Sequence, residues 1–378
     1  MTDFGPSRAL LRRVRVACLL AALGGVAVNA HAQCGDWEPV GTGRSGSVFA
    51  MTVFDDGSGP ALYAGQSFPN QSPGIARWDG SAWLPFAGYF TDGGMNPSIH
   101  ALKGWNDGTG PALYVAGIFG SVDWIPGTGN IVRLRASTGW EPVGDGISSY
   151  RRQEEVYALA SLGGWLYAGG AFEERFGNPG NNIARWNGSA WSPLGGGVGA
   201  AWDAVFALEV FNDGSGPALY VGHSSWHSDF IDRWDGSSWW PVGTGVSGSV
   251  SALKVFDDGN GPALYAGGWF TGAGGNPANR IARWDGTAWS ALGEGVSGGG
   301  INALTVFDDG TGPALYAGGT FTEAGGRPAS RIARWDGTAW TPLGAGVSGG
   351  QWAAVHAMSV FDDGTGPALY AAGRFEEA

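Results

Sequence analysis

Two histidines four residues apart are the side chains whose type and spacing most directly suggest chemistry in this sequence. His223 and His227 stand in the segment His-Ser-Ser-Trp-His, and Asp229 and Asp232 follow closely. Imidazole and carboxylate groups at such spacing can bind a transition metal such as zinc. A zinc site needs further matching ligands, and no cysteine or third histidine stands near this segment. We therefore assign no metal site here and interpret the segment as a structural or surface-binding element.

Acidic, glycine-rich segments of the form Asp-Asp-Gly-x-Gly recur along the chain, for example at 257–261. Carboxylates and main-chain carbonyls in a glycine-rich loop suit calcium. These segments lack the alternating Asp-x-Asp spacing of a calcium loop, and one copy is replaced by Leu162-Gly163-Gly164-Trp165. We therefore expect hairpin turns at these places and assign no cofactor.

No pattern typical of a catalytic site is found, and we assign no catalytic residue. The sequence has no phosphate-binding loop opening a helix, no Gly-x-Ser-x-Gly nucleophile turn and no Cys–His pair. A glycosidase would need two carboxyl groups about 5–9.5 Å apart. The acidic residues outside any recurring pattern are Asp145, Glu154, Glu155, Glu173, Glu174 and Asp203. The sequence does not bring two of them together, so enzymatic activity stays an open question.

Internal repeats are the elements that must position all of these residues. Residues 252–293 and 303–344 are nearly identical, and related copies recur with a period of about 51 residues. The weaker copies begin at Ala50, Ala101, Ala158, Ala207 and Ala357. Each unit holds four short apolar stretches of the forms ALxVF, ALYAGG, IARWD and AWxPLG, and an Asp-Gly hairpin signal separates the last two. Four short strands at this period predict one antiparallel blade of a β-propeller.

The repeated phrases resemble those of known propeller proteins. ALYAGG is similar to the kelch strand that ends in a diglycine, and Trp284 with Trp289 resembles the kelch aromatic pair. The phrase IARWDGxxWxxLGxGV also resembles repeats of fungal cortical cell-polarity marker proteins. The resemblance implies a kelch-like propeller. It concerns residues that build the fold, so it implies little about function.

Counting the stretches predicts how the ring closes. The first, second and fourth stretches occur seven times, if Trp37-Glu-Pro-Val-Gly is counted as a fourth stretch. The third stretch occurs six times, because the chain stops just before its seventh copy. We therefore expect an all-β, kelch-like propeller of seven four-stranded blades, with the last blade incomplete and the Trp37 segment as its outer strand.

The N-terminal segment has the features of a secretory signal peptide. Residues 1–32 contain a basic start, an apolar run over 16–28 and the small-x-small pattern Ala30-His31-Ala32. We expect their removal to leave 33–378 as a single propeller domain that is secreted, extracellular or periplasmic. No later segment is apolar enough to span a membrane. The net charge of −12 disfavours nucleic acids and anionic membrane surfaces as partners.

The repeats separate residues of the fold from candidates for function. Residues that recur in every unit hold the unit together, and we expect the recurring arginines to bond carbonyls or carboxylates between blades. Departures by single units gather in the loops that join strands 2 to 3 and strands 4 to 1, which lie on one face of an antiparallel ring. The candidate ligand-binding residues are Tyr89, Phe90, Trp124, Trp202, His223, Trp226, His227 and Trp352.

Two functions remain open for these candidates. Exposed aromatic rings on one rim suit a protein surface or the C–H faces of sugars, although the same rings could pack against neighbouring loops. We expect a secreted recognition or scaffold protein that binds an extracellular protein or glycan through this rim. The alternative is a carbohydrate-active enzyme, a glycosidase or lyase, on a propeller scaffold.

Overall fold

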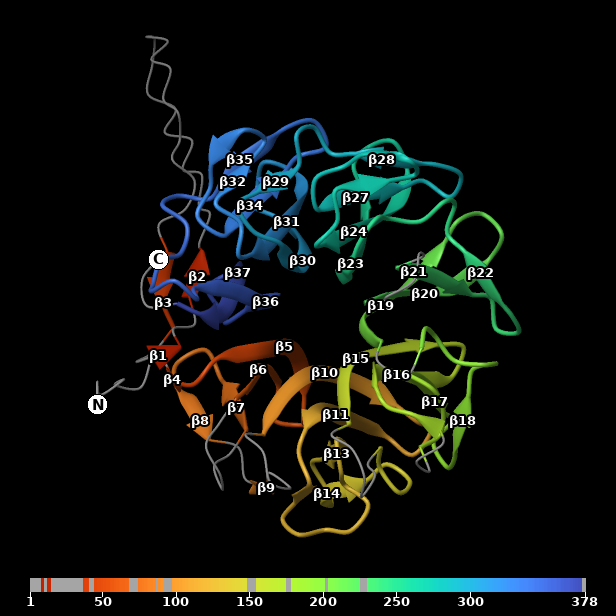
Figure 1. The fold of residues 1–378 in the computed structure, drawn as a ribbon. Coiled ribbons are helices and arrows are strands. Elements are labelled where there is room, and N and C mark those ends of the chain that lie inside the picture. Colours follow the sequence, from red (N-terminus) through yellow and green to blue (C-terminus); the bar gives the residue numbers. More distant parts are fainter. Residues whose placement is uncertain are drawn as a thin grey trace, which may run out of the picture.

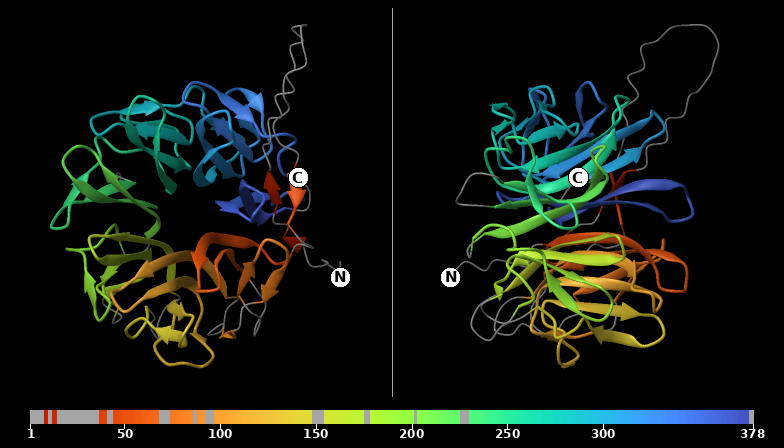
Figure 2. Two further views of the ribbon diagram at one scale, coloured as in Figure 1. Left: turned by 180° about the vertical axis from the view of Figure 1, so that it is seen from behind. Right: turned by 90° about the vertical axis from the view of Figure 1, so that its right-hand side faces the viewer.

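The chain folds as an all-β propeller. The structure is a computed structural model that describes residues 8–9, 12–14, 37–40, 44–67, 74–85, 88–91, 97–147, 154–174, 178–200, 203–224 and 230–375. In these residues seven four-stranded antiparallel sheets are arranged as a ring (Figure 1), which Figure 2 shows from behind and from the side. The predicted fold class is therefore confirmed. None of the described residues forms a helix able to cross a membrane.

Each sheet is one blade, with its strands in the order 1-2-3-4 from the axis outward. The first strands are β5 (Val48–Asp55), β10 (Ser98–Asn106), β15 (Glu155–Leu162), β19 (Ala204–Asn212), β23 (Val250–Asp257), β30 (Ile301–Asp308) and β36 (Ala354–Asp362). The second strands are β6 (Pro60–Gln66), β11 (Pro111–Ile118), β16 (Trp165–Ala171), β20 (Pro217–Ser224), β24 (Pro262–Gly268), β31 (Pro313–Gly319) and β37 (Pro367–Arg374).

The outer strands follow the same order from blade 1 to blade 7. The third strands are β7 (Ile75–Trp78), β13 (Ile131–Arg135), β17 (Ile183–Trp186), β21 (Ile231–Trp234), β27 (Ile281–Trp284), β34 (Ile332–Trp335) and β2 (Arg12–Val14). The fourth strands are β8 (Trp83–Pro85), β14 (Gly139–Pro142), β18 (Trp191–Pro193), β22 (Trp239–Pro241), β28 (Trp289–Ala291), β35 (Trp340–Pro342) and β3 (Trp37–Pro39).

Short strands add to the edges and loops of the blades. They are β1 (Arg8–Ala9), β4 (Arg44–Ser45), β9 (Phe90–Thr91), β12 (Ser121–Val122), β25 (Gly272–Ala273), β26 (Asn276–Pro277), β29 (Val296–Ser297), β32 (Glu323–Ala324) and β33 (Arg327–Pro328). Among them, β1 pairs with β4 and β9 pairs with β12.

The seventh blade joins both ends of the described chain, as the red and blue strands of Figure 1 show. The Trp37 segment, β3, is its outermost strand, as predicted. The third place, which we expected to be vacant, is taken by Arg12–Val14. Arg13 lies opposite Tyr370 there, just as Arg77 lies opposite Tyr63 in the first blade. Arg13 thus takes the register position of the arginine in the repeated third strand.

The apolar core lies between blades. The described residues form seven hydrophobic clusters, and each cluster takes its members from two adjacent blades. The first glycine of the recurring diglycine allows this close approach. A Cβ on Gly267 would lie 2.6 Å from Ile301 Cγ2 in the next blade. Because both faces of a blade are covered only by its neighbours, the ring stabilises each blade.

Within the described residues, the recurring tryptophan of the fourth strand links six of the blades to the preceding one by a hydrogen bond. Its indole Nε1 donates to a main-chain carbonyl just after the preceding fourth strand, at 2.9 Å for Trp289 and Val242. The equivalent pairs are Trp83–Val40, Trp191–Val143, Trp239–Leu194 and Trp340–Leu292. Trp37 donates to Leu343 at 3.4 Å, so the same contact joins blade 7 to blade 6.

The recurring arginines act within blades, which corrects our expectation that they bond between blades. Arg283 on the third strand lies 3.3 Å from Asp258 in the turn between the first two strands of its own blade, and Tyr265 donates to the same carboxylate at 2.9 Å. The shorter turn of blade 3 lacks this aspartate, and there Arg185 lies over the ring of Trp165 at 4.3 Å. The arginine therefore fastens the outer strand to the inner turn.

The acidic turns are hairpins built by their own carboxylates. Asp257 accepts hydrogen bonds from the main-chain nitrogens of Gly259 and Gly261 at 2.9 and 3.0 Å. Asp258 accepts from the nitrogen of Asn260 at 3.1 Å. The repeated aspartates thus have a role in the turn itself.

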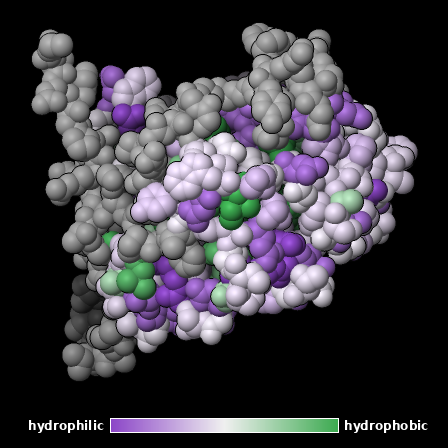
Figure 3. All heavy atoms as spheres, turned by 90° about the horizontal axis from the view of Figure 1, so that it is seen from below, coloured by the Kyte–Doolittle hydropathy of each residue, from purple (hydrophilic) through white to green (hydrophobic). Residues whose placement is uncertain are grey.

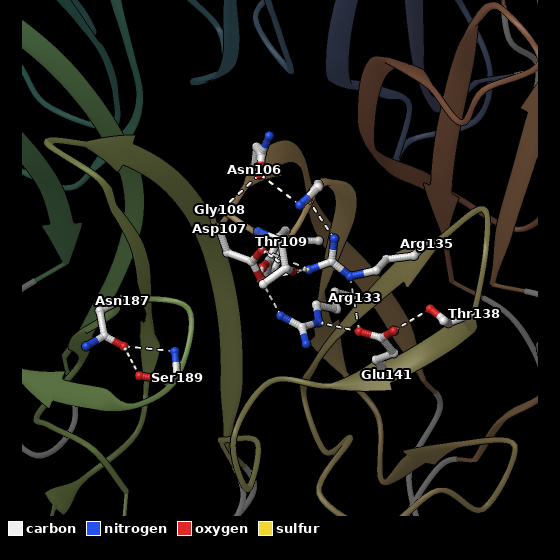
Figure 4. Close-up of polar contacts among 12 residues, drawn as sticks. Asn106, Asp107, Gly108, Thr109, Arg133, Arg135, Thr138, Glu141, Asn187 and Ser189 are labelled. Carbon is white, nitrogen blue, oxygen red and sulfur yellow. Dashed lines mark hydrogen bonds and ion pairs between the residues drawn. The ribbon is translucent and has the colours of Figure 1, made fainter.

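Asp107 in blade 2 makes the densest of these networks (Figure 4). Its carboxylate meets both Arg133 and Arg135, and Glu141 contacts the same two arginines from the outer strand. Burial raises the pKa of Asp107, but hydrogen bonds from Thr109 and the charge and hydrogen bonds of Arg135 outweigh it and lower this pKa to about 2.

We expect Asp107→Asn to destabilise the protein at neutral pH by about 3 kcal/mol, because two partly buried arginines lose a charged partner. A carboxyl whose pKa is lowered on folding contributes stability above its unfolded pKa of about 3.9, and the contribution is lost as the pH falls toward 2. The variant should therefore lose less stability than the wild type between about pH 4 and pH 2. Urea unfolding at a series of pH values measures this, with the exposed Asp145→Asn as control. Parallel pH profiles for Asp107→Asn and the wild type would contradict the prediction.

We expect Trp37→Ala to destabilise the protein by about 3–5 kcal/mol, since it removes a buried ring and the contact that joins blade 7 to blade 6. Thermal and urea unfolding measure the loss. The exposed Trp240→Ala is the matched control and should unfold like the wild type. If Trp37→Ala is as stable as this control, β3 does not close the ring.

Candidate functional site

The antiparallel blades separate two faces of the ring. One face, here called the loop face, carries the loops from strand 2 to strand 3 and from strand 4 to the next strand 1. The opposite face, the turn face, carries the acidic hairpins and the Asp-Gly hairpins. The units differ most on the loop face and agree most on the turn face. The residues that distinguish one unit from another therefore lie mainly on the loop face.

Two predicted residues, Tyr89 and Trp124, are brought together on the loop face. Strand β9 pairs with β12, and just beyond this pair Asp123 N donates to the main-chain carbonyl of Tyr89 at 2.9 Å. Tyr89 is 53% exposed and Trp124 is 67% exposed. Phe90, in contrast, is buried against Phe119 and Trp140. Its ring belongs to the core between blades 1 and 2 and offers no surface to a partner.

The loop that carries Trp124 has an unusual and well-fixed backbone. Asp123 and Trp124 have φ values of 48° and 59°, in the left-handed region that non-glycine residues rarely adopt. The fully buried Thr128 accepts from the main-chain nitrogen of Val122 and donates to the carbonyl of Ile125. Strained backbone of this kind persists where its surroundings fix it, often at functional sites. The loop thus holds an exposed indole in a defined position.

Two further tryptophans are exposed on the loop face. Trp352, a predicted candidate, is 65% exposed at a turn closed by the Ala353 N to Gly350 O bond. Trp269 is 55% exposed and packs on Gly300, where a Cβ would lie 2.4 Å from the indole. Sequence analysis missed Trp269, although the other units carry different residues at this place before the recurring phenylalanine.

His223 is buried inside blade 4. Its Nε2 lies 2.9 Å from Asp232 Oδ2, and its Nδ1 lies 3.3 Å from the carbonyl of Ser224. His223 stands where most units have the second glycine, and Asp232 stands where most have alanine, so the two departures form one pair. The other predicted candidates, Trp202, Trp226 and His227, lie outside the described residues.

Acidic candidates for catalysis are spread over the loop face of blades 2 to 4. Glu154, Glu173 and Asp203 are buried, and Asn178 donates to Glu154 Oε1 and to the carbonyl of Glu173. Burial raises the pKa of Glu155. Asp145 and Glu174 are exposed. Within the described residues no group of three His, Cys, Asp or Glu side chains is placed to hold a metal ion.

A second set of residues on this face surrounds the axis. Every first strand has a β-bulge near its start, at the same place in each blade, for example between Val48 and Ala50. The residue in each bulge is left out of the ladder, and the innermost strands contact one another around the axis (Figure 1). We call these residues the axial collar: Phe49, His100, Tyr157, Phe206, Ser251, Asn302 and His356.

The rings of the axial collar form a continuous arc. Centroid distances are 4.9 Å from His356 to Phe49, 5.0 Å from Phe49 to His100, 5.1 Å from His100 to Tyr157 and 5.0 Å from Tyr157 to Phe206. The main-chain carbonyl of Val355 accepts from the amide of Asn302, which also lies 3.5 Å from His356 Nδ1. The arc therefore ends at a polar side.

Both histidines of the axial collar are neutral at ordinary pH. Burial lowers the pKa of His100 to about 4, and the nearby His356 adds to this effect. Burial and the charge of Arg374 lower the pKa of His356 to about 4. His100 Nε2 lies 2.9 Å from Ser98 Oγ. The collar thus offers uncharged rings and hydrogen-bonding groups.

Sequence analysis did not single out the axial collar. A signal for it was present, because the residue between the constant Val/Ile and the constant Ala of each first strand differs in nearly every unit. That single position is overshadowed in the sequence by the longer variable loops. The seven residues become one group only when the ring brings the strands together.

Comparisons with known proteins add the following. No protein-family model and no curated protein matches the chain. Among solved structures, the computationally designed Ika8 protein is 14% identical over 86% of this chain and 96% of its own, with a TM-score of 0.42. A GH74 enzyme from Niastella koreensis is 15% identical over 78% of this chain and 45% of its own, with a TM-score of 0.46. A chain of the mitotic checkpoint complex is 12% identical over 84% of this chain and 88% of its own, with a TM-score of 0.47.

Proposed function

We propose that the protein is a recognition module that binds an extracellular protein or a glycan through its loop face. The observation that carries the proposal is the set of large aromatic rings that well-fixed loops of this face leave exposed. They are Tyr89, Trp124, Trp269 and Trp352. Interfaces concentrate their binding energy in a few aromatic anchors, so such rings are suited to contact a partner.

The rigidity of these loops supports binding over simple surface packing. Trp124 is held in a left-handed conformation that costs about 1–3 kcal/mol to maintain. Tyr89 is fixed beside it, because its main-chain nitrogen donates to Asp123 Oδ1 at 2.8 Å. A rigid aromatic loses little conformational entropy on binding, which raises the affinity of the contact.

The outer wall of the ring is a less suitable surface. Figure 3 shows one side of it, where hydrophilic and neutral residues predominate and the hydrophobic ones form small, separate patches. Trp240 is 53% exposed but lies on an outer strand, and its indole donates to Asp235 of its own hairpin at 2.7 Å. A partner that needs apolar contact would therefore be directed to the loop face.

The double variant Trp124→Ala, Trp352→Ala should bind its partner at least tenfold more weakly than the wild type, because each exposed ring is an anchor. Unfolding temperature should stay nearly unchanged, since neither ring is buried. A glycan array and affinity capture followed by mass spectrometry identify the partner, and surface plasmon resonance compares the variants.

Trp240→Ala is the control for that experiment, because it removes an equally exposed ring away from the loop face. Equal loss of affinity for Trp240→Ala and the double variant would place the contact elsewhere. If the double variant unfolds at a much lower temperature, the two rings serve packing, and the proposal fails.

The type of repeat and the role of the N-terminal segment complete the proposal. We take the repeats to be kelch-like, on the diglycine and the paired tryptophans. We take residues 1–32 to direct export, so that the protein acts outside the cell or in the periplasm. Removal of this segment would also remove Arg12–Val14 from the third place of blade 7.

We expect the protein secreted by a bacterial host carrying the full sequence to begin at residue 33. Intact-mass and N-terminal peptide measurements on the secreted protein test this. A host strain that lacks export capacity provides the unprocessed control. Secreted protein that retains Arg12–Val14 would contradict the expected cleavage and would indicate that this strand belongs to the mature, secreted propeller.

A further inference from the structure

We infer that the axial collar is a binding site for a neutral sugar ring, such as the terminal unit of a glycan. This inference deepens the proposed function and rests on it, because the collar lies on the loop face. The exposed tryptophans of the loop face do not by themselves distinguish a protein from a glycan, whereas the collar is suited to one class of ligand.

The fold does not need the rings of the collar. The residues on either side of each bulge are constant in type, with Val or Ile before it and Ala after it. The bulge residue itself is Ser251 in blade 5 and Asn302 in blade 6, and both blades form the same bulge as the others. The ring side chains at this position in the other five blades therefore serve something other than blade formation.

The bulges direct these side chains toward one another. A bulge takes its extra residue out of the ladder and re-aims the side chain, a device often found beside active sites. Ring centroids about 5 Å apart join four neighbouring pairs around the axis, from His356 through Phe49 to Phe206. Five separate repeats thus contribute to one half-buried aromatic surface.

The charge state of the collar selects against ionic ligands. It contains no acidic or basic side chain other than the two histidines, which burial keeps neutral. Three residues further along the innermost strands, Glu209 and Lys254 pair with each other at 3.4 Å, and Lys103 stands at the same position of β10. A phosphate or carboxylate would lose its hydration at the seven collar residues and would meet positive charge only outside them, at groups such as Arg374, whose charge acts on His356.

The distribution of polar groups also selects against a purely apolar ligand. Ser251 and Asn302 occupy the two places of the collar between Phe206 and His356, and Tyr157, His100 and His356 add groups that can donate or accept. His100 and Asn302 have partners in Ser98 and the carbonyl of Val355, but an apolar ligand would bury the hydroxyl groups of Tyr157 and Ser251 without new hydrogen bonds, at a cost in free energy. A sugar ring has apolar C–H faces for the aromatic arc and hydroxyl groups for the polar side.

The test uses isothermal titration calorimetry on the full chain with neutral oligosaccharides. The probes are cellohexaose, xylohexaose, mannohexaose and chitohexaose, with hexagalacturonic acid as the charged comparison. At least one neutral probe should bind, and more tightly than the acidic one. Failure of all four neutral probes, or preference for hexagalacturonic acid, would overturn the inference.

The repeats supply variants that should keep the fold. Phe49→Ser and Tyr157→Asn introduce residues that blades 5 and 6 already carry at the equivalent position. Each variant should lower the affinity for the oligosaccharide that the wild type binds at least tenfold, while its unfolding temperature should change little. Unchanged affinity in both variants would overturn the assignment of the ligand to the collar.

The rim variants separate this inference from the proposed function. If Trp124→Ala and Trp352→Ala weaken binding of a captured partner but the collar variants do not change binding of any sugar, recognition by the loop face stands and the collar inference fails. If the collar variants abolish sugar binding and the rim variants change nothing, the collar inference stands and the role of the rim tryptophans fails.

Discussion

The fold depends above all on the hydrogen bond from a fourth-strand indole to the main chain of the preceding blade. Trp289 donates to Val242, and the same contact recurs around the ring as far as Trp37 and Leu343. The bond is directional and carries a large ring into the apolar space between two blades, so it fixes their spacing and their relative rotation. The hydrophobic clusters then form around it, each shared by two blades.

This contact explains why the sequence predicts the architecture so well. The phrase AWxPLG contains the donor and ends near the acceptor, so the repeated phrase itself contains both groups of the contact between blades. The Trp37 segment was assigned to the last blade because counting the stretches left that blade without a fourth strand of its own. The sequence could not show which group the recurring arginine of the third strand contacts. Arg283 reaches Asp258 of its own blade, a contact set by strand pairing between segments about 25 residues apart.

The candidate site was predicted less completely, for physical reasons that particular residues illustrate. Tyr89 and Trp124 were placed on the correct face, because an antiparallel blade leaves no other place for their loops. Phe90 and Tyr89 are neighbours in sequence, yet Phe90, the first residue of β9, packs on Phe119 and Trp140, whereas Tyr89 precedes the strand and is exposed. His223 is buried because it lies on the second strand of its blade, which neighbouring elements cover along nearly its whole length. The axial collar depends on the closed ring, so no single unit could reveal it.

The bulge has a consequence for how such a protein can change over evolutionary time. A residue held outside the ladder can be exchanged without shifting strand register, and Phe, His, Tyr, Ser and Asn already occupy the seven equivalent places. Each blade thus contributes one freely replaceable position to a common centre, while the rest of the repeat is held by its neighbours. Duplication supplies identical blades, and single substitutions then diversify the centre. The ring is in this sense a scaffold whose selectivity can be altered, or engineered, one blade at a time.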